Sequence, residues 1–183
     1  MTELILYMGG CCGDIVTGLI DTKGISITSG KCIVLKERSK LKRSFQFNND
    51  AEKNAYIASA ERYWRSLPTH DAEYHIRNKH HYTGIVCHDQ KTALWCATRF
   101  RKLHSDPVWK RMSKNSGAKT IEEYAQQILD FSNMIETYAH NTIELNDIIN
   151  GNAIQRLEKL TTIDVNARIL YDQWIEDVVT QSD

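Results

Sequence analysis

Short apolar runs alternate with amphipathic segments along much of the chain. The first run, Leu4 to Met8, is continuously apolar and ends at two glycines, as is typical of a strand buried on both faces of a parallel sheet. A second run of this kind covers Tyr82 to Cys87. Helical spacing of apolar residues follows each run, over Asp14 to Asp21 and over Gln90 to His104. These strand-loop-helix units predict an α/β fold with a mainly parallel central sheet.

The remaining segments complete one domain that spans residues 1–183. Ile25 to Leu35 is β-branched and interrupted at Ser29-Gly30, which predicts a hairpin or a strand with a turn. Asp50 to Ser66 predicts an amphipathic helix, and residues from about 120 to 183 form a helix-rich C-terminal part. The other expected elements are a strand end or loop at Leu67 to His70, a short helix from Pro107 to Met112, a polar loop from Lys114 to Lys119, a long helix after a Thr120/Glu123 capping box, a strand at Thr142 to Leu145, and helices over Asn152 to Leu160 and Asn166 to Val179.

Charge is balanced, with 23 lysines and arginines against 23 aspartates and glutamates. No global field therefore draws the protein to nucleic acid or to anionic lipid, and neither partner is indicated. The most basic stretch runs from Lys36 to Arg43. It fits either a solvated loop or strand edge, or a local contact with a polyanion.

The expected location is the cytoplasm. The five cysteines are odd in number and form no CxxC pair, and a 21.1 kDa domain does not depend on disulfides. The opening MTELILYMGG carries an acidic residue where a secretory signal needs basic ones, and no later stretch is apolar enough to span a membrane.

A glycine-rich loop joins the first expected strand to its helix. A strand that passes through small residues into a helix leaves backbone N–H groups at the positive helix end, which favours an anion. The position after Gly13 is Asp14, so the loop lacks the lysine of a GxxxxGK[ST] motif, and Asp14 would repel phosphate unless it capped the helix. A tight turn without a ligand remains the alternative. The phosphate-binding candidates are Gly9, Gly10, Cys11, Cys12, Gly13 and Asp14.

The second unit, IVCHDQKTALWCATRF from Ile85 to Phe100, resembles a sulfotransferase segment in which an apolar strand precedes R-D-P-x-x-A and then a serine. In that family the arginine and serine hold the 3′-phosphate of 3′-phosphoadenosine 5′-phosphosulfate. The corresponding positions here are His88 and Cys96, and Asp89 matches the family aspartate. A third segment, Ile143 to Ile149, is similar to the family's late strand and Y-E-D-L turn.

Leu67-Pro68-Thr69-His70 is similar to the strand end of the family's K-x-H motif. The resemblance makes His70 the general base that deprotonates a hydroxyl acceptor. A histidine suits that role because its reference pKa lies near 6.5. A structural histidine is the simpler alternative.

The resemblance implies a three-layer P-loop-type fold, truncated relative to the family. It also implies transfer of a sulfuryl or phosphoryl group from 3′-phosphoadenosine 5′-phosphosulfate, or another nucleotide, to a hydroxyl. Histidine and cysteine replace the family's phosphate-binding arginine and serine, and the cation that the loop lacks would come from Arg77, Lys79, Arg99 or Arg101.

Other functions remain open at this point. A degenerate P-loop domain could serve as an interaction module, with its helical half in contact with a protein partner or a second copy. Nucleotide kinase chemistry is a further alternative. The His88-Asp89 pair also suits a metal-dependent phosphohydrolase, although the strand before it argues against that all-helical class. Six of the seven histidines lie between His70 and His104, yet no pair has structural-zinc spacing, so no metal site is expected.

Overall fold

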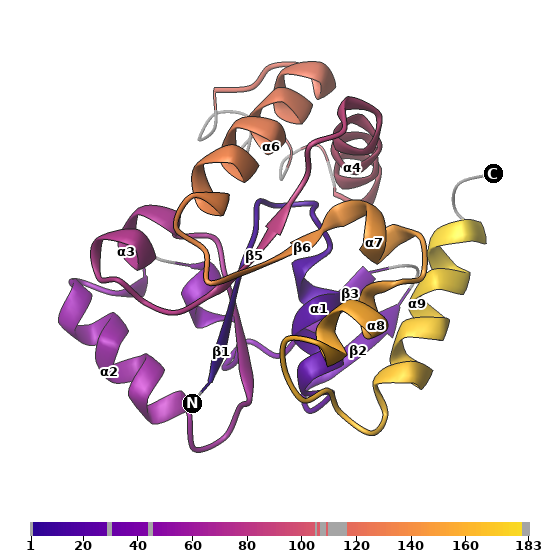
Figure 1. The fold of residues 1–183 in the computed structure, drawn as a ribbon. Coiled ribbons are helices and arrows are strands. Elements are labelled where there is room, and N and C mark those ends of the chain that lie inside the picture. Colours follow the sequence, from indigo (N-terminus) through magenta and orange to yellow (C-terminus); the bar gives the residue numbers. More distant parts are fainter. Residues whose placement is uncertain are drawn as a thin grey trace.

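The computed structural model describes residues 2–28, 31–43, 46–104, 106, 109 and 117–180. Its central sheet has four parallel strands in the order β4-β1-β5-β6. The first expected strand lies inside this sheet, where Ile5 is paired with Pro68 on one side and with Thr83 on the other. The chain is therefore an α/β protein with a parallel central sheet (Figure 1). The strands are β1 (Glu3–Leu6), β4 (Ser66–Thr69), β5 (Thr83–Val86) and β6 (Asn141–Glu144).

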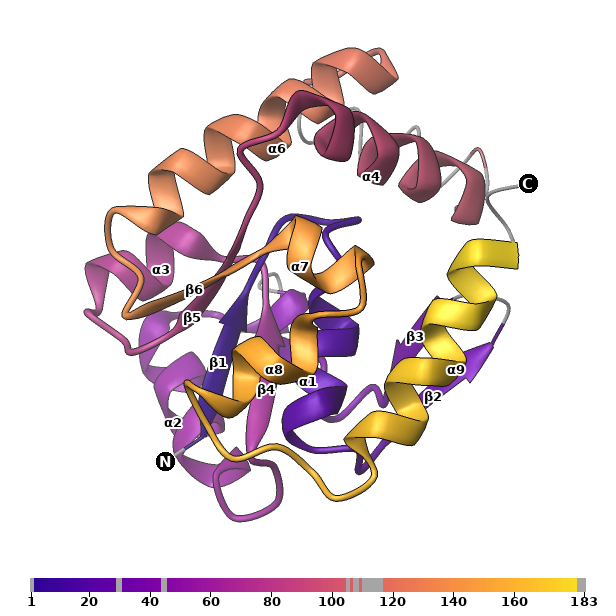
Figure 2. The ribbon, with the colours of Figure 1, turned by 45° about the vertical axis from the view of Figure 1, so that its right-hand side comes forward.

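Helices cover both faces of the sheet, because successive strand residues point to opposite sides and each side is apolar. Ile5 and Ile85 belong to one core, whereas Leu6 and Val86 belong to the other. The first core is completed by α1 (Gly13–Ile20), α4 (Gln90–Leu103), α7 (Leu145–Ile149), α8 (Ala153–Glu158) and α9 (Ala167–Thr180). The second is completed by η1 (Lys40–Lys42), α2 (Asp50–Ala60) and α3 (Ala72–Arg77), and α6 (Ile121–Glu136) contributes to both (Figure 2).

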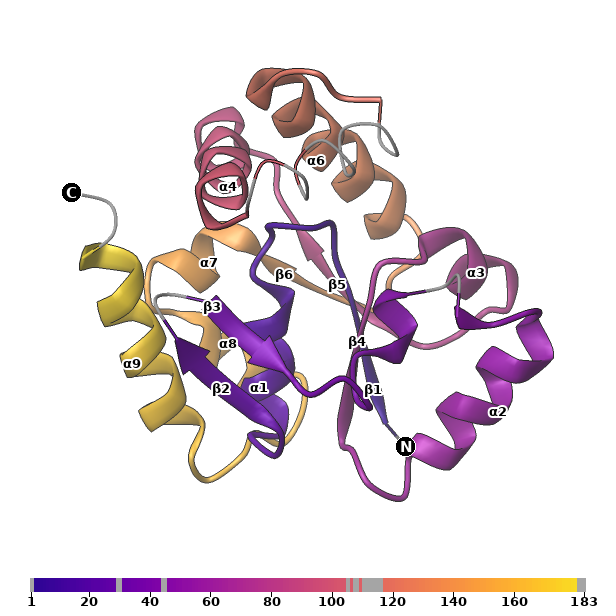
Figure 3. The same ribbon diagram turned by 180° about the vertical axis from the view of Figure 1, so that it is seen from behind.

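The β-branched segment after α1 forms an antiparallel hairpin of β2 (Ile25–Thr28) and β3 (Lys31–Val34). This confirms the hairpin alternative. The hairpin lies beside α1 and α9 and apart from the main sheet (Figure 3). It therefore forms a wall next to the amino end of α1.

Two expected helix boundaries are wrong. The helix from Asp50 ends at Ala60, because Ser66 pairs with Glu3 as the first residue of β4. Pro68 is tolerated there because β4 is an edge strand of the sheet. Asp14 is not the N-cap of the first helix, since α1 begins at Gly13 with Cys12 as its cap.

Side chains cap the amino ends of α4 and α6. Thr120 accepts a hydrogen bond from the backbone of Glu123, and the reciprocal bond completes the predicted capping box of α6. Asp89 accepts a hydrogen bond from the Thr92 N–H, 2.7 Å away, and caps α4. All of the expected helix from Pro107 to Met112 except residue 109, and the first half of the expected Lys114 to Lys119 loop (114–116), lie outside the described residues. The short helices α3 and α7 were not predicted.

The basic stretch after the hairpin is not uniformly solvated, because Arg38 is buried with no exposed side-chain surface. Its guanidinium donates to the carbonyl oxygens of Asp21, Lys23, Thr17 and Ser66 at 2.6–3.0 Å. Burial lowers the pKa of Arg38, and Asp21 counters that effect. Arg38 thus ties the hairpin exit to the end of α1 and the start of β4.

No helix in the described part of the chain is long and apolar enough to cross a membrane.

Candidate functional site

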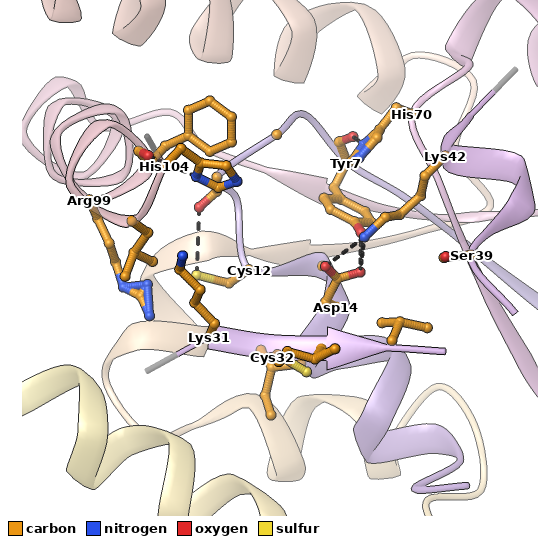
Figure 4. A pocket seen from close by; sticks show the side chains of 18 of the residues that line it. Tyr7, Cys12, Asp14, Lys31, Cys32, Ser39, Lys42, His70, Arg99 and His104 are labelled. Carbon is orange, nitrogen blue, oxygen red and sulfur yellow. Dashed lines mark hydrogen bonds and ion pairs between the residues drawn. The ribbon is translucent and has the colours of Figure 1, made fainter. Parts of the chain in front are cut away.

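A cavity of about 590 Å³ lies at the amino end of α1, next to the segments that leave β1 and β4 (Figure 4). The strand order places this region near a topological switch point, since the chain runs from β1 to β4 on one side and returns to β5 on the other. Open α/β sheets bind ligands outside the carboxyl ends of their strands at such points. The hairpin and α4 supply the remaining walls.

The glycine loop forms the floor of this cavity. Gly9, Gly10, Cys12 and Gly13 all line it. Cys12 adopts a left-handed conformation with φ of 58° directly before the helix. Among the described residues, the N–H groups of Gly10, Cys12 and Gly13 have no hydrogen-bond acceptor. This is the backbone arrangement that the sequence predicted for an anion site.

Gly13 also has a packing role that the sequence did not reveal. A Cβ on Gly13 would lie 2.1 Å from the Tyr7 ring, so only glycine permits this approach. The Tyr7 hydroxyl in turn donates a 2.5 Å hydrogen bond to Oδ1 of Asp14. Burial and the Asp14 carboxylate hold the pKa of Tyr7 well above its usual value.

Asp14 lies in the first turn of α1 and lines the cavity. Its two carboxylate oxygens accept hydrogen bonds from the Lys42 ammonium at 2.7 and 2.8 Å. Figure 4 shows Lys42 and Tyr7, which come from different parts of the chain, both pointing toward Asp14. The negative charge that the sequence set against phosphate binding is therefore compensated by a lysine from outside the loop.

Cations predominate around the cavity. Lys31 comes from the hairpin, Lys42 and Arg43 from the segment after it, and Arg99 from α4. Among the described lining residues, Asp14 is the one carboxylate. Four cations against one carboxylate make a local positive field in a protein of zero formal net charge.

Sequence reasoning found part of this cation set. Arg99 was named as a substitute for the missing loop lysine, and it does line the cavity. Arg77 pairs with Asp50 and Arg101 pairs with Asp106, and neither they nor Lys79 line it. Lys31 was missed, because nothing in the local pattern shows that the hairpin folds back over α1.

His70, the general base implied by the resemblance to the K-x-H strand end, lines the cavity. Its Nδ1 lies 2.7 Å from the carbonyl oxygen of Tyr7. A carbonyl only accepts, so Nδ1 carries the proton and Nε2 keeps its lone pair. Burial first, and Lys42 next, lower the pKa of His70 to about 4. The ring is therefore neutral at pH 7, in a tautomer that can accept a proton at Nε2.

Three of the predicted phosphate-binding side chains do not line the cavity: Cys11, His88 and Cys96. His88 is exposed, with Nε2 3.0 Å from Glu136 and Nδ1 2.8 Å from Glu144. Cys96 is fully buried in the core against Cys11 and Cys12. The structure thus brings Gly9, Gly10, Cys12, Gly13, Asp14 and His70 together at the cavity. Cys96 lies against the loop but does not line the cavity, and His88 lies outside it, paired with Glu136 and Glu144.

No set of three or more metal-ligating side chains in the described part of the chain is arranged to hold a metal ion. Ammonium, guanidinium, imidazole and backbone groups line the cavity.

Comparison of the chain with models of known protein families, with curated proteins and with solved structures finds no match.

Proposed function

We propose that this cavity binds the phosphate or sulfate groups of a nucleotide, and that the protein is a sulfotransferase-like P-loop group transferase. It would move a sulfuryl or phosphoryl group from the nucleotide to a hydroxyl acceptor. One observation carries the proposal. Four cations and unpaired loop N–H groups surround a cavity that also presents a neutral histidine.

Lys42 takes the part of the lysine that the glycine loop lacks. Transfer of a charged group depends on positioned cations, because charge on the transferring group must be stabilised as the bond breaks. The Lys42 ammonium is held at the amino end of α1 by Asp14. A lysine from another element can therefore stabilise the charge of an anion that is bound by the loop N–H groups.

His70 is the proposed base toward the acceptor hydroxyl. A base with a pKa of about 4 is weak, but part of that depression comes from the Lys42 charge. An anionic ligand next to Lys42 would offset this charge and raise the pKa of His70 toward neutrality. Ligand binding and base strength would then be linked through one lysine.

The donor is a nucleotide in this proposal, either 3′-phosphoadenosine 5′-phosphosulfate or another. The volume falls within the range of small-molecule sites, roughly 300 to 1,000 Å³. Phe100 and Trp174 line the cavity and offer apolar surface to a base. His88 and Cys96 cannot hold a 3′-phosphate from where they lie, so Lys31 and Arg43 are its proposed partners.

The test is turnover by matched variants with a panel of nucleotide and sulfonucleotide donors. His70→Ala should abolish transfer and leave donor affinity nearly unchanged, because a general base acts on the acceptor proton. His88→Ala, a histidine variant outside the cavity, should retain transfer. Equal turnover in wild type and His70→Ala would remove His70 from the reaction.

A further inference from the structure

Three thiols meet where the glycine loop crosses α4. Cys11 and Cys12 lie in the loop, and Cys96 lies in the second turn of α4. The Cys96 side chain lies next to those of Cys11 and Cys12, and its backbone oxygen would lie 3.3 Å from a Cβ on Gly10, so the loop rests on α4 at this residue. All three cysteines are free thiols. Two loop sulfurs are therefore within contact of a third that is distant in sequence.

The three thiols differ in access to the cavity. Cys12 lines it, and its Sγ lies 3.8 Å from the carbonyl oxygen of Gly10 (Figure 4). Cys11 and Cys96 are buried, at 2% and 0% exposure. A reagent that enters the cavity therefore meets Cys12 first.

The surroundings also favour the thiolate of Cys12. The neighbouring Cys96 thiol lowers the pKa of Cys12, and nearby Arg99 acts in the same direction against the effect of burial. Burial instead raises the pKa of Cys96. Because the thiolate is the nucleophile, Cys12 is the more reactive member of the pair.

We propose that Cys12 is an oxidant-sensitive modification site and that Cys96 resolves it, so that the two form a reversible disulfide between the glycine loop and α4. The oxidant is a low-molecular-weight disulfide such as glutathione disulfide, whose carboxylates suit the cationic cavity. The proposal concerns thiol chemistry alone and does not depend on the function proposed above.

The exchange balances in two steps. The Cys12 thiolate attacks one sulfur of glutathione disulfide, which forms a mixed disulfide and releases one glutathione thiolate. Cys96 then gives up its proton and attacks the Cys12 sulfur, which releases the second glutathione. Two protein thiols are oxidised, one glutathione disulfide is reduced, and the two thiol protons pass to the two glutathione thiolates.

The test uses the folded full-length protein in glutathione buffers of increasing oxidation, with acid quenching, alkylation and peptide mapping. The Cys12-containing peptide should become linked to the Cys96-containing peptide, and dithiothreitol should release it. Wild type that keeps all five thiols free in excess glutathione disulfide would overturn the proposal. So would a stable link from Cys12 to Cys32, the other cysteine that lines the cavity.

Single variants distinguish the roles of the adjacent residues Cys11 and Cys12. Cys11→Ser should keep the link and Cys12→Ser should lose it, and the reverse result would contradict the proposal. Cys96→Ala should stop at the mixed glutathione disulfide on Cys12, which intact mass detects. Thermal melting of each variant identifies any that fail to fold. If a variant fails, fragmentation of the linked wild-type peptide between residues 11 and 12 assigns the pairing.

Discussion

Lys42 Nζ lies 2.7 Å from Oδ2 of Asp14, and this ion pair joins the segment after the hairpin to the first turn of α1. Each side chain is about a fifth exposed, and both line the cavity. Asp14, the one carboxylate among the described lining residues, is therefore paired with Lys42, the cation proposed to replace a P-loop lysine.

Asp14→Asn should tighten the binding of an anionic nucleotide. The change removes a carboxylate from an anion site and frees Lys42, and a charge pair near 4 Å in well-solvated surroundings is worth about 1 kcal/mol, or roughly fivefold in affinity. Isothermal titration of wild type and variant measures the effect. Glu37→Gln, an exposed carboxylate outside the lining, is the control. Weaker binding by Asp14→Asn would mean that Asp14 is needed to position Lys42.

Lys42→Gln should raise the pKa of His70. Lys42 is the second-largest cause of its depressed pKa, after burial, so loss of that charge should move the titration upward from about 4. Histidine ring signals in NMR spectra, followed from pH 3 to pH 8, report the change. A phosphorylated ligand added to wild type should shift His70 in the same direction. His88, paired with two glutamates away from the cavity, should not respond, and an unchanged His70 would break the proposed link.

Gly13→Ala should destabilise the fold through Tyr7. The new Cβ would overlap the Tyr7 ring, and overpacking of this kind costs about 1–3 kcal/mol. A double-mutant cycle with Tyr7→Ala, measured by urea unfolding, isolates the contact. Gly13→Ala should cost much less in the Tyr7→Ala background. Equal costs in both backgrounds would show that the clash is relieved elsewhere.

Arg38→Met should lower the free energy of unfolding by about 3 kcal/mol or more, because it leaves several buried carbonyl oxygens without donors. The control is Lys36→Met, an exposed cation two residues earlier, which should change stability by less than about 0.5 kcal/mol. Urea unfolding of the three proteins gives both values. A loss as small as that of the control would mean that water replaces the guanidinium.

The sheet could be predicted because its signals are local. Leu4 to Met8 and Tyr82 to Cys87 are apolar on both faces, and only a covered strand suits such a run. The short helices α3 and α7 could not be predicted, because five or six residues carry too little periodicity.

The candidate site was predictable only where it follows a strand. Gly10 and Gly13 belong to the loop and helix start that follow β1, His70 directly follows β4, and neighbouring parallel strands bring their carboxyl ends to one edge. Lys42 was not assigned to the site, and Arg38 was not expected in the core, although both lie in one basic stretch. Whether a residue of this stretch reaches the cavity or the core depends on how the hairpin packs against α1. That packing is a long-range contact, which no local sequence pattern contains.

Isothermal titration of adenosine 3′,5′-bisphosphate and ATP into wild type, Lys42→Gln/Arg43→Gln and Lys36→Gln tests anion binding by the cavity most directly. We predict saturable binding to wild type that weakens with added salt, falls by about tenfold or more in the double variant and is unchanged in Lys36→Gln. No binding to wild type, or equal affinity in wild type and the double variant, would contradict a nucleotide site at the amino end of α1.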